Sequence, residues 1–323
     1  MWSLQARMYL LLAALFALIY MVVTVIGTGL GITNFYFYLV VSVGMMFLQY
    51  LIGPKMVEWS MRVRYVEESE APDLHRMVAE LARQAGIPKP RVGISQLQIP
   101  NAFAFGRGPS DGRMCVTSGV LQLLDKDELR AVIGHEITHL KSRDVLTITI
   151  LSVIPMVLYR IAWGLMWYGG GRRRERGGPS LAVVGMLSFF FYFITNLLVL
   201  YASRLREYFA DEGSVRLGNR PEHLASALYK LVYGSARVDK ESLKEVEGVK
   251  AFFLNDPSQA RNDIMELSQV DLDRSGTISS MELKQIQTQT LRLGFADRLM
   301  EMVSTHPNML KRIKQLSQYD MTG

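Results

Sequence analysis

Residues 135–139 read His135-Glu136-Ile137-Thr138-His139. On a helix, positions i and i+4 lie one above the other on a single face, so both imidazoles can point at one metal ion. Glu136 then projects beside that ion, where its carboxylate can take a proton from bound water and pass it to a departing amine. The pattern is typical of zinc peptidases. The alternative is a helix with two solvated histidines and no metal.

The residues before this motif carry the signals of a helix start. Asp125 can serve as the N-cap, and Glu128, three residues later, can reach back to it. Leu129, Val132 and Ile133 then provide an apolar stripe with helical spacing. We therefore expect a single helix to carry both histidines.

A third ligand is expected, because catalytic zinc usually has three protein ligands and one position open to water. Residues 203–211 read Ser-Arg-Leu-Arg-Glu-Tyr-Phe-Ala-Asp, which puts Glu207 and Asp211 at i and i+4. We predict that Glu207 is the third ligand and that Asp211 orients a liganding imidazole. The alternative is a juxtamembrane helix with solvated charges. If the ligands share one ion, segment 140–206 crosses the membrane an even number of times, two or zero.

Long uncharged runs predict an integral membrane protein. Residues 8–54 are 47 consecutive uncharged residues, whereas one span needs about 20, so two helices fit. Two further runs, 145–168 and 181–202, predict a helical hairpin that crosses the membrane or is embedded in it, although Arg160 is costly in lipid. A cleaved signal peptide is not expected, because the first apolar run is too long.

Basic residues near the ends of the spans predict the orientation. Lys55, Arg62 and Arg64 favour a catalytic part in the cytoplasm, in a multi-pass protein of the inner cell membrane. The loop between the two later runs disagrees, because full crossing by both hairpin helices would place outside the arginines Arg172, Arg173, Arg174 and Arg176. Either a partly embedded hairpin or a tolerated exception reconciles the two observations.

The composition limits which kinds of partner the protein is expected to bind. The net charge is +6, and a membrane surface accounts for it better than nucleic acid does, because no basic stripe interleaved with aromatic residues occurs in the polar segments. Cys115 is the only cysteine, so no intramolecular disulfide can form. It lies in an apolar run, which predicts a buried thiol.

We expect a mainly α fold with a small β-sheet, in which a multi-helix integral membrane protein carries a zincin-like catalytic domain. Two N-terminal transmembrane helices would occupy residues 1–54, and the transmembrane or membrane-embedded hairpin residues 145–202. The catalytic domain would comprise 55–144, with the zinc-binding helix, and 203–323. The soluble elements predicted by periodicity are helices at 72–85 and 221–233, the latter stopped by Gly234, and strands at 91–97 and 114–117.

Residues 101–106 read Asn-Ala-Phe-Ala-Phe-Gly and lie between the two predicted strands. Alternating Phe and Ala followed by Gly suit an extended strand, and a peptidase can bind its peptide by adding it to a sheet edge. An ordinary buried hairpin fits the pattern equally well.

Residues 271–282 read Asp-Leu-Asp-Arg-Ser-Gly-Thr-Ile-Ser-Ser-Met-Glu, within an EF-hand-like segment at 258–291. They match the twelve-residue calcium loop, with Gly276 at its sharp turn, Ser279 acting through water and ligands from Asp271, Asp273, Ser275, Thr277 and Glu282. Such loops normally work in pairs, and no second copy is visible, so a calcium-free helix–loop–helix is the alternative. A loop facing the cytoplasm would suit a calcium sensor that adjusts proteolysis.

Together these motifs resemble the HtpX heat-shock membrane proteases and, more distantly, the CAAX prenyl endoproteases. The resemblance rests on the paired N-terminal spans, residues 101–104, the His135–His139 motif with Asp144, the apolar hairpin, residues 203–211, and residues 304–307 with Arg312 and Ile313. It implies an integral-membrane zinc endopeptidase of the gluzincin type. Such an enzyme acts on misfolded or damaged membrane proteins from the cytoplasmic side. The calcium-like loop departs from the family pattern.

The resemblance also implies roles for individual residues. His135, His139 and Glu207 would be the zinc ligands and Glu136 the base. Asn101, with Ala102 and Phe103 of the same strand, would bind substrate. His306 would be a catalytic residue that stabilises the tetrahedral intermediate, although a helix cap before Pro307 explains it as well.

Two other functions compete with this one. A prenyl-protein endoprotease uses the same zinc set, but at most four spans are predicted here, too few to enclose a large helical chamber. A non-catalytic, calcium-responsive membrane scaffold would have no use for Glu136. We therefore expect an endopeptidase that hydrolyses peptide bonds with a zinc-activated water and is modulated by calcium.

Overall fold

The structure is a computed structural model. It describes residues 51–144, 181–237, 269–289 and 301–319, with a few further positions between 147 and 162 and at 264, 267 and 294. Residues 1–50 of the predicted N-terminal helix pair, Arg160 and the arginine-rich loop lie outside the described residues. The chain divides into two compact units, one of residues 52–145 and 206–323 and the other of residues 1–51 and 146–205.

The first of these units contains a four-stranded sheet in the order β1-β2-β4-β3. The strands are β1 (Val63–Tyr65), β2 (Arg91–Ser95), β3 (Ala102–Phe105) and β4 (Arg113–Thr117). β2 and β4 are parallel, whereas β1 and β3 pair with them antiparallel. β3 is therefore an edge strand, and among the described residues no strand pairs with its outer side.

α3 (Pro72–Ala85) begins and ends, and α5 (Lys126–Ser142) begins, where the sequence predicts. α3 has Pro72 in its first turn and ends at Gly86, whose φ of 72° is left-handed. α5 carries the predicted capping box of Asp125 and Glu128. A short helix η1 (Pro109–Asp111) and α4 (Ser118–Leu123) complete this part of the unit.

One predicted helix end is wrong. α8 (Pro221–Ala236) runs through Gly234 instead of stopping there. The glycine is explained by close packing, because a Cβ at this position would lie 2.9 Å from side-chain atoms of Leu123 and Pro100. The residue therefore permits an approach of neighbouring elements and does not end the helix.

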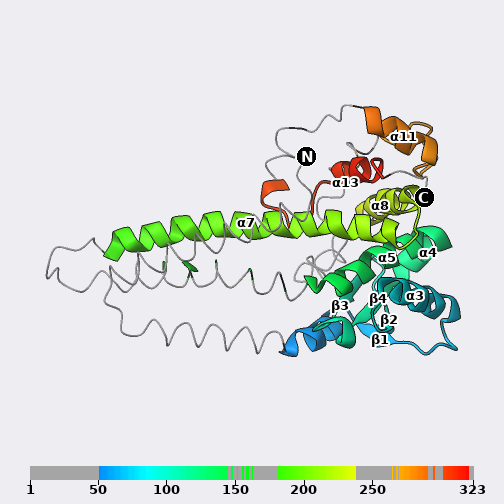
Figure 1. Cartoon of the computed structure of the whole chain (residues 1–323), viewed down its shortest axis with the longest axis horizontal. Coiled ribbons are helices and arrows are strands. Elements are labelled where there is room, and N and C mark those ends of the chain that lie inside the picture. The colour runs from blue at the N-terminus through cyan, green and yellow to red at the C-terminus, as the bar shows by residue number, and fades with distance from the viewer. Residues whose placement is uncertain are drawn as a thin grey trace. The chain divides into compact units, whose positions relative to one another are not determined.

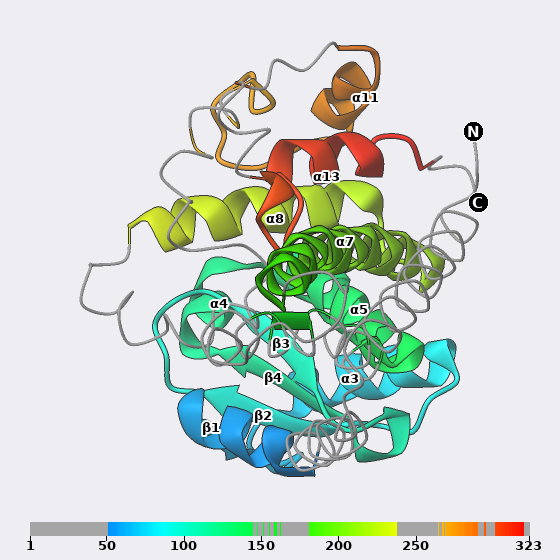
Figure 2. The same ribbon diagram turned by 90° about the vertical axis from the view of Figure 1, so that its left-hand side faces the viewer.

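The helices stack on the sheet in successive layers (Figures 1 and 2). α5 packs against β3, α3 and α8, and α13 (Met309–Leu316) lies on α8. α11 (Ser280–Thr288) packs on α13 and α8. One continuous apolar core joins these layers, so α5 is buried between the sheet and the later helices.

A smaller core cluster contains Val57, Met61, Phe103, Phe105 and Cys115. It joins the helix at residues 51–60 to the sheet. The Cys115 side chain has no exposed surface, which confirms the predicted buried thiol.

Among the described residues, one helix is long and apolar enough to cross a membrane. This helix, α7 (Leu181–Arg216), has no charged residue before Arg204. It continues unbroken through Glu207 and Asp211, so the apolar run and the acidic pair share one helix. The mainly helical fold with a small sheet is confirmed, while the number of spans stays a prediction.

Candidate metal centre and active site

The two histidines of α5 face each other. Their Nε2 atoms lie 3.0 Å apart, and each Nδ1 is held by a carboxylate, at 2.8 Å from Asp211 Oδ1 for His135 and at 2.5 Å from Asp144 Oδ2 for His139. Because each Nδ1 donates its proton to a carboxylate, both Nε2 atoms are acceptors and cannot bond each other. A cation between them would satisfy both lone pairs, so the donor set fits a metal ion.

Glu207 of α7 is the third group at this point. Its Oε1 lies 3.6 Å from His139 Nε2, and its Oε2 lies 3.7 Å from His135 Nε2. The structure therefore brings the three sequence-predicted ligands together from two separate helices. Burial lowers the pKa of His135 to about 4, which keeps this imidazole neutral, as a metal ligand must be.

Glu136 lies between the two histidines in the chain and forms a potential metal-binding group with them. Burial raises the pKa of its carboxyl group to about 7. The Ala104 N–H of β3 donates to Glu136 Oε2 at 2.8 Å. The side chain is thus fixed against the edge strand.

Arg312 of α13 is a member of the site that periodicity and spacing do not reveal. Fully buried, it donates from Nε to Asp211 Oδ2 at 2.9 Å and from Nη2 to Asp211 Oδ1 at 2.6 Å. Its Nη1 lies 3.1 Å from Glu207 Oε2. Burial alone would lower the pKa of Arg312, but the two carboxylates outweigh it and raise the pKa. One guanidinium therefore balances two buried acids.

Asp144 is the partner of His139 because of how α5 ends. Arg143 is in the left-handed conformation, with φ of 54°, and turns the chain back so that Asp144 reaches His139. Arg206 forms an ion pair with the other oxygen of Asp144. A five-residue spacing across a helix end gives no periodic signal, so only the family resemblance pointed to this residue.

His306 lies beside the predicted ligands, with Nδ1 3.5 Å from Glu207 Oε2. Within the part of the chain that the structure describes, its two buried ring nitrogens make no hydrogen bond. The alternative that His306 caps a helix is wrong, since Asn308 is the N-cap of α13 and its Oδ1 accepts from Leu310 N.

The predicted substrate residues lie at the start of β3. Asn101 is buried, and its backbone bonds Thr117 of β4. Ala102 and Phe103 are also buried, and the Phe103 ring packs in the smaller core cluster. A peptide added to this strand would thus meet its backbone and not the Phe103 ring.

The calcium-like loop is a compact, self-bonded turn. Asp271 accepts from Ser275 N and Gly276 N at 3.0 Å, and from Tyr229 OH of α8 at 2.7 Å. Glu282 accepts from Leu272 N at 2.8 Å and from Ser279 N at 2.9 Å. Ser279 serves as the N-cap of α11. Asp271, Asp273 and Glu282 form a second group that could hold a metal, and Ser275 Oγ lies 3.0 Å from Thr277 Oγ1.

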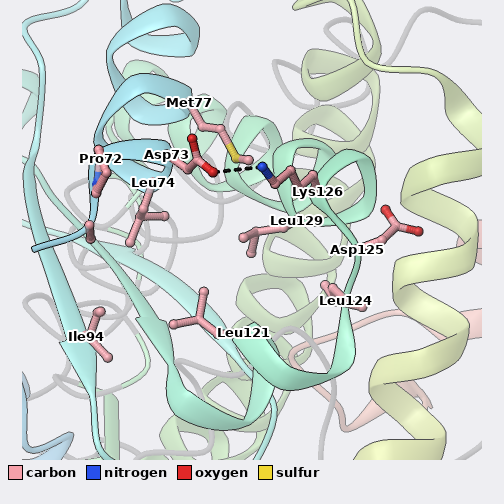
Figure 3. Close-up of a pocket in the computed structure, with 11 residues that line it drawn as sticks. Pro72, Asp73, Leu74, Met77, Ile94, Leu121, Leu124, Asp125, Lys126 and Leu129 are labelled. Carbon is pink, nitrogen blue, oxygen red and sulfur yellow. Dashed lines mark hydrogen bonds and ion pairs between the residues drawn. The ribbon is translucent and has the colours of Figure 1, made fainter.

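A hollow of about 290 Å³ opens between the starts of α3 and α5 (Figure 3). The Asp73 carboxylate and the Lys126 ammonium meet across it at 2.8 Å. The rest of its lining is mostly aliphatic, from Leu74, Met77, Ile94, Leu121, Leu124 and Leu129. No residue of the metal-binding group lines it, so it is not part of the active site.

A helix that presents two imidazole acceptors with a buried carboxylate between them has the chemistry of a metallopeptidase. The fold and the site therefore define this class of protein. The chain belongs to peptidase family M48, whose model matches residues 68–320. It is accordingly a zinc metalloendopeptidase, and its helix α7 is long and apolar enough to cross a membrane. The resemblance seen in the sequence is confirmed.

Individual relatives agree with this assignment. The chain is 52% identical over 231 residues to "Protease HtpX homolog" of Methanothermobacter thermautotrophicus, covering 72% of this chain and 86% of the relative. It is 37% identical over 272 residues to the protein of the same name from Moorella thermoacetica, covering 82% and 89%. The crystal structure of S. mikatae Ste24p matches with a TM-score of 0.54 at 15% identity. This match covers 98% of this chain but 64% of that structure, and it shows the fold alone.

Proposed function

We propose that the zinc ion of this peptidase is held by His135, His139 and Glu207. The observation that carries the proposal is the pair of Nε2 atoms that face each other at 3.0 Å while both Nδ1 atoms are held by carboxylates. Glu207 adds oxygen to the two nitrogens. Two imidazoles and a carboxylate, with one position left for water, are a known ligand set of catalytic zinc.

Zinc bound there would polarise the scissile carbonyl and lower the pKa of a water molecule. Glu136 would act as the general base, taking a proton and returning it to the departing amine. Its hydrogen bond from Ala104 N–H supports this role, because it fixes the carboxylate beside the metal-binding group. His306, whose buried nitrogens lie next to Glu207, would donate to the developing oxyanion.

The substrate would bind as an extra strand along β3, next to Asn101, Ala102 and Phe103. β3 is an edge strand, and the N–H of Ala104 points away from β4 toward Glu136. Backbone hydrogen bonds would hold a peptide that adds to this edge next to the general base, Glu136. Such binding depends little on side chains, which suits an enzyme that cuts unfolded chains of varied sequence.

We further propose that the substrates are misfolded or damaged membrane proteins, cut on the cytoplasmic face of the inner membrane by a multi-pass enzyme. The continuity of α7 from an apolar segment into Glu207 supports cleavage close to the bilayer. Lys55, Arg62 and Arg64, after the first uncharged run, support the cytoplasmic orientation.

Casein cleavage by the detergent-purified protein tests the catalytic assignment. We expect activity in the wild type, its loss with a chelator, and its recovery when zinc is added back. Glu136→Gln should abolish cleavage while the protein keeps its metal, because this residue is not a ligand. Wild-type turnover by Glu136→Gln would reject Glu136 as the base.

A second proposal is that calcium binds the 271–282 loop through Asp271, Asp273, Ser275, Thr277 and Glu282 and adjusts proteolysis. Ile278 occupies the apolar eighth position of the loop, which in paired loops packs against the partner loop. Here it is buried in the core of the catalytic unit. The Tyr229 hydroxyl also ties Asp271 to α8, which packs on α5. A single loop anchored in this way has less need of a second copy and has a route to the helix with the histidines.

Calcium titration of the wild type, Glu282→Gln and the exposed-acid control Glu67→Gln tests this second proposal. We expect heat of binding in the wild type and control, and a much weaker signal in Glu282→Gln. Protease activity measured across the same calcium range should change in the wild type and the control but stay constant in Glu282→Gln. Identical activity curves for wild type and Glu282→Gln would remove the regulatory role.

A further inference from the structure

The helix at residues 51–60 is firmly attached to the catalytic unit on one side. Val57 and Met61 are buried in the smaller core cluster. The Glu58 carboxylate accepts from Arg113 Nε at 2.9 Å and from Tyr65 OH at 2.5 Å. These contacts fix which way the helix faces, so its other side is presented outward by the fold.

The outward side is apolar. Ile52, Met56 and Trp59 follow each other at helical spacing and are 43%, 59% and 85% exposed. A tryptophan exposed to this degree beside exposed aliphatic side chains is unfavourable in water. It is typical of the membrane interface, where an amphipathic ring sits at the level of the lipid headgroups.

Two cations border this apolar stripe. A shallow hollow of about 750 Å³ is lined by Lys55, Glu58, Trp59, Ser60, Arg62 and Val63. The negative charge of Glu58 is already balanced by Arg113. The hollow therefore has a net positive charge, from Lys55 and Arg62, beside an exposed indole.

The position of the helix in the chain indicates what covers this face. Residues 52–54 end the run of 47 uncharged residues, and Lys55 is the first charged residue after it. The change from lipid-compatible to basic sequence therefore falls within this helix. The nearest surface that combines apolar and anionic chemistry at such a point is the headgroup layer of a bilayer.

We propose that Ile52, Lys55, Met56, Trp59 and Arg62 form a contact surface for the bilayer that selects anionic phospholipids. The indole and the aliphatic side chains would enter the interface, and the two cations would hold a lipid phosphate in the hollow. None of these five residues belongs to the proposed zinc or substrate site. The surface would hold the catalytic unit against the membrane.

Fluorescence quenching in lipid nanodiscs tests this surface. The full-length protein would keep Trp59 as its single tryptophan, with phenylalanine in place of the other three, Trp2, Trp163 and Trp167. Brominated phosphatidylglycerol and brominated phosphatidylcholine would be compared at equal mole fraction in otherwise identical discs. Lys55→Gln with Arg62→Asn would remove both cations, since asparagine tolerates the left-handed backbone of Arg62, whose φ is 48°. Arg83→Gln with Lys89→Gln would remove equal charge elsewhere on the same unit.

Each outcome decides the proposal. We expect at least about twofold stronger quenching by the anionic lipid, from attraction at two basic residues. The excess should vanish in the Lys55 and Arg62 variant and persist in the control. Equal quenching by both lipids in the starting protein would overturn lipid selection. Quenching by aqueous acrylamide without quenching by either lipid would overturn the membrane contact and point to water or a protein partner. The measurement does not read catalysis, so it is independent of the proposed zinc ligands.

Discussion

Arg312 and Asp211 form a two-pronged ion pair, at 2.9 and 2.6 Å, and neither side chain has any exposed surface. The same Asp211 also bonds His135 Nδ1 at 2.8 Å. Asp211, on α7, therefore links Arg312 of α13 to His135 of α5. The position of the His135 imidazole thus depends on the Arg312 guanidinium. We predict that this contact governs both stability and metal binding.

Arg312→Gln should destabilise the protein strongly. It leaves Asp211 buried without its charge partner, which costs about 3–5 kcal/mol in the free energy of unfolding. Denaturant unfolding in detergent would measure this loss. Lys311→Gln is the neighbouring control, because Lys311 is 38% exposed and its ion pair with Glu301 should contribute about 1 kcal/mol or less. Equal losses in the two variants would contradict a special role for Arg312.

Asp144→Asn should weaken zinc binding while the fold is kept. The carboxylate accepts the Nδ1 proton of His139, and removal of such a partner typically lowers metal affinity about 10–100-fold. Competition with a chromophoric chelator would measure the change. Asp127→Asn, an exposed acid at the other end of α5, should leave the affinity as it is. An unchanged affinity in Asp144→Asn would show that Asp144 does not support the metal site.

Cys115 should resist alkylation in the folded protein. Burial raises the pKa of its thiol, and only the thiolate form reacts readily. Iodoacetamide labelling followed by mass spectrometry should show slow modification at about pH 8, near the ordinary pKa of a free thiol, and rapid modification in denaturant. Fast labelling under native conditions would mean that the smaller core cluster opens readily.

Ala104→Pro should reduce kcat/KM without loss of zinc. Proline removes the N–H that holds Glu136 Oε2, and an edge strand tolerates it because the outer N–H is not part of the sheet. Ala104→Gly, which keeps the N–H, is the matched control. Cleavage assays with parallel metal analysis would separate the two effects, and equal activity in both variants would count against this backbone contact.

Features specified by local sequence could be predicted. α5 follows from its capping box and apolar stripe, and the His135–His139 spacing identifies the metal site within it. Glu207 and Asp211 were predicted to act together because one helical turn separates them, and α7 carries both. In each case the relevant residues lie a few positions apart, where helix geometry alone fixes their relation.

Features that depend on tertiary packing could not be predicted in this way. Arg312 reaches the site because α13 packs on α8, and nothing near it in the chain indicates a buried partner. Gly234 looked like a helix stop, whereas its role comes from the approach of Leu123 and Pro100. The edge position of β3 likewise depends on how the strands are ordered across the sheet.

The zinc content of the purified protein tests the central claim most directly. Inductively coupled plasma mass spectrometry would be applied to the wild type, Glu136→Gln and Glu207→Gln after dialysis against metal-free buffer. We predict about one zinc ion per chain in the wild type and in Glu136→Gln, and a large loss in Glu207→Gln, because of these two glutamates only Glu207 is proposed as a zinc ligand. Wild-type zinc content in Glu207→Gln would contradict it.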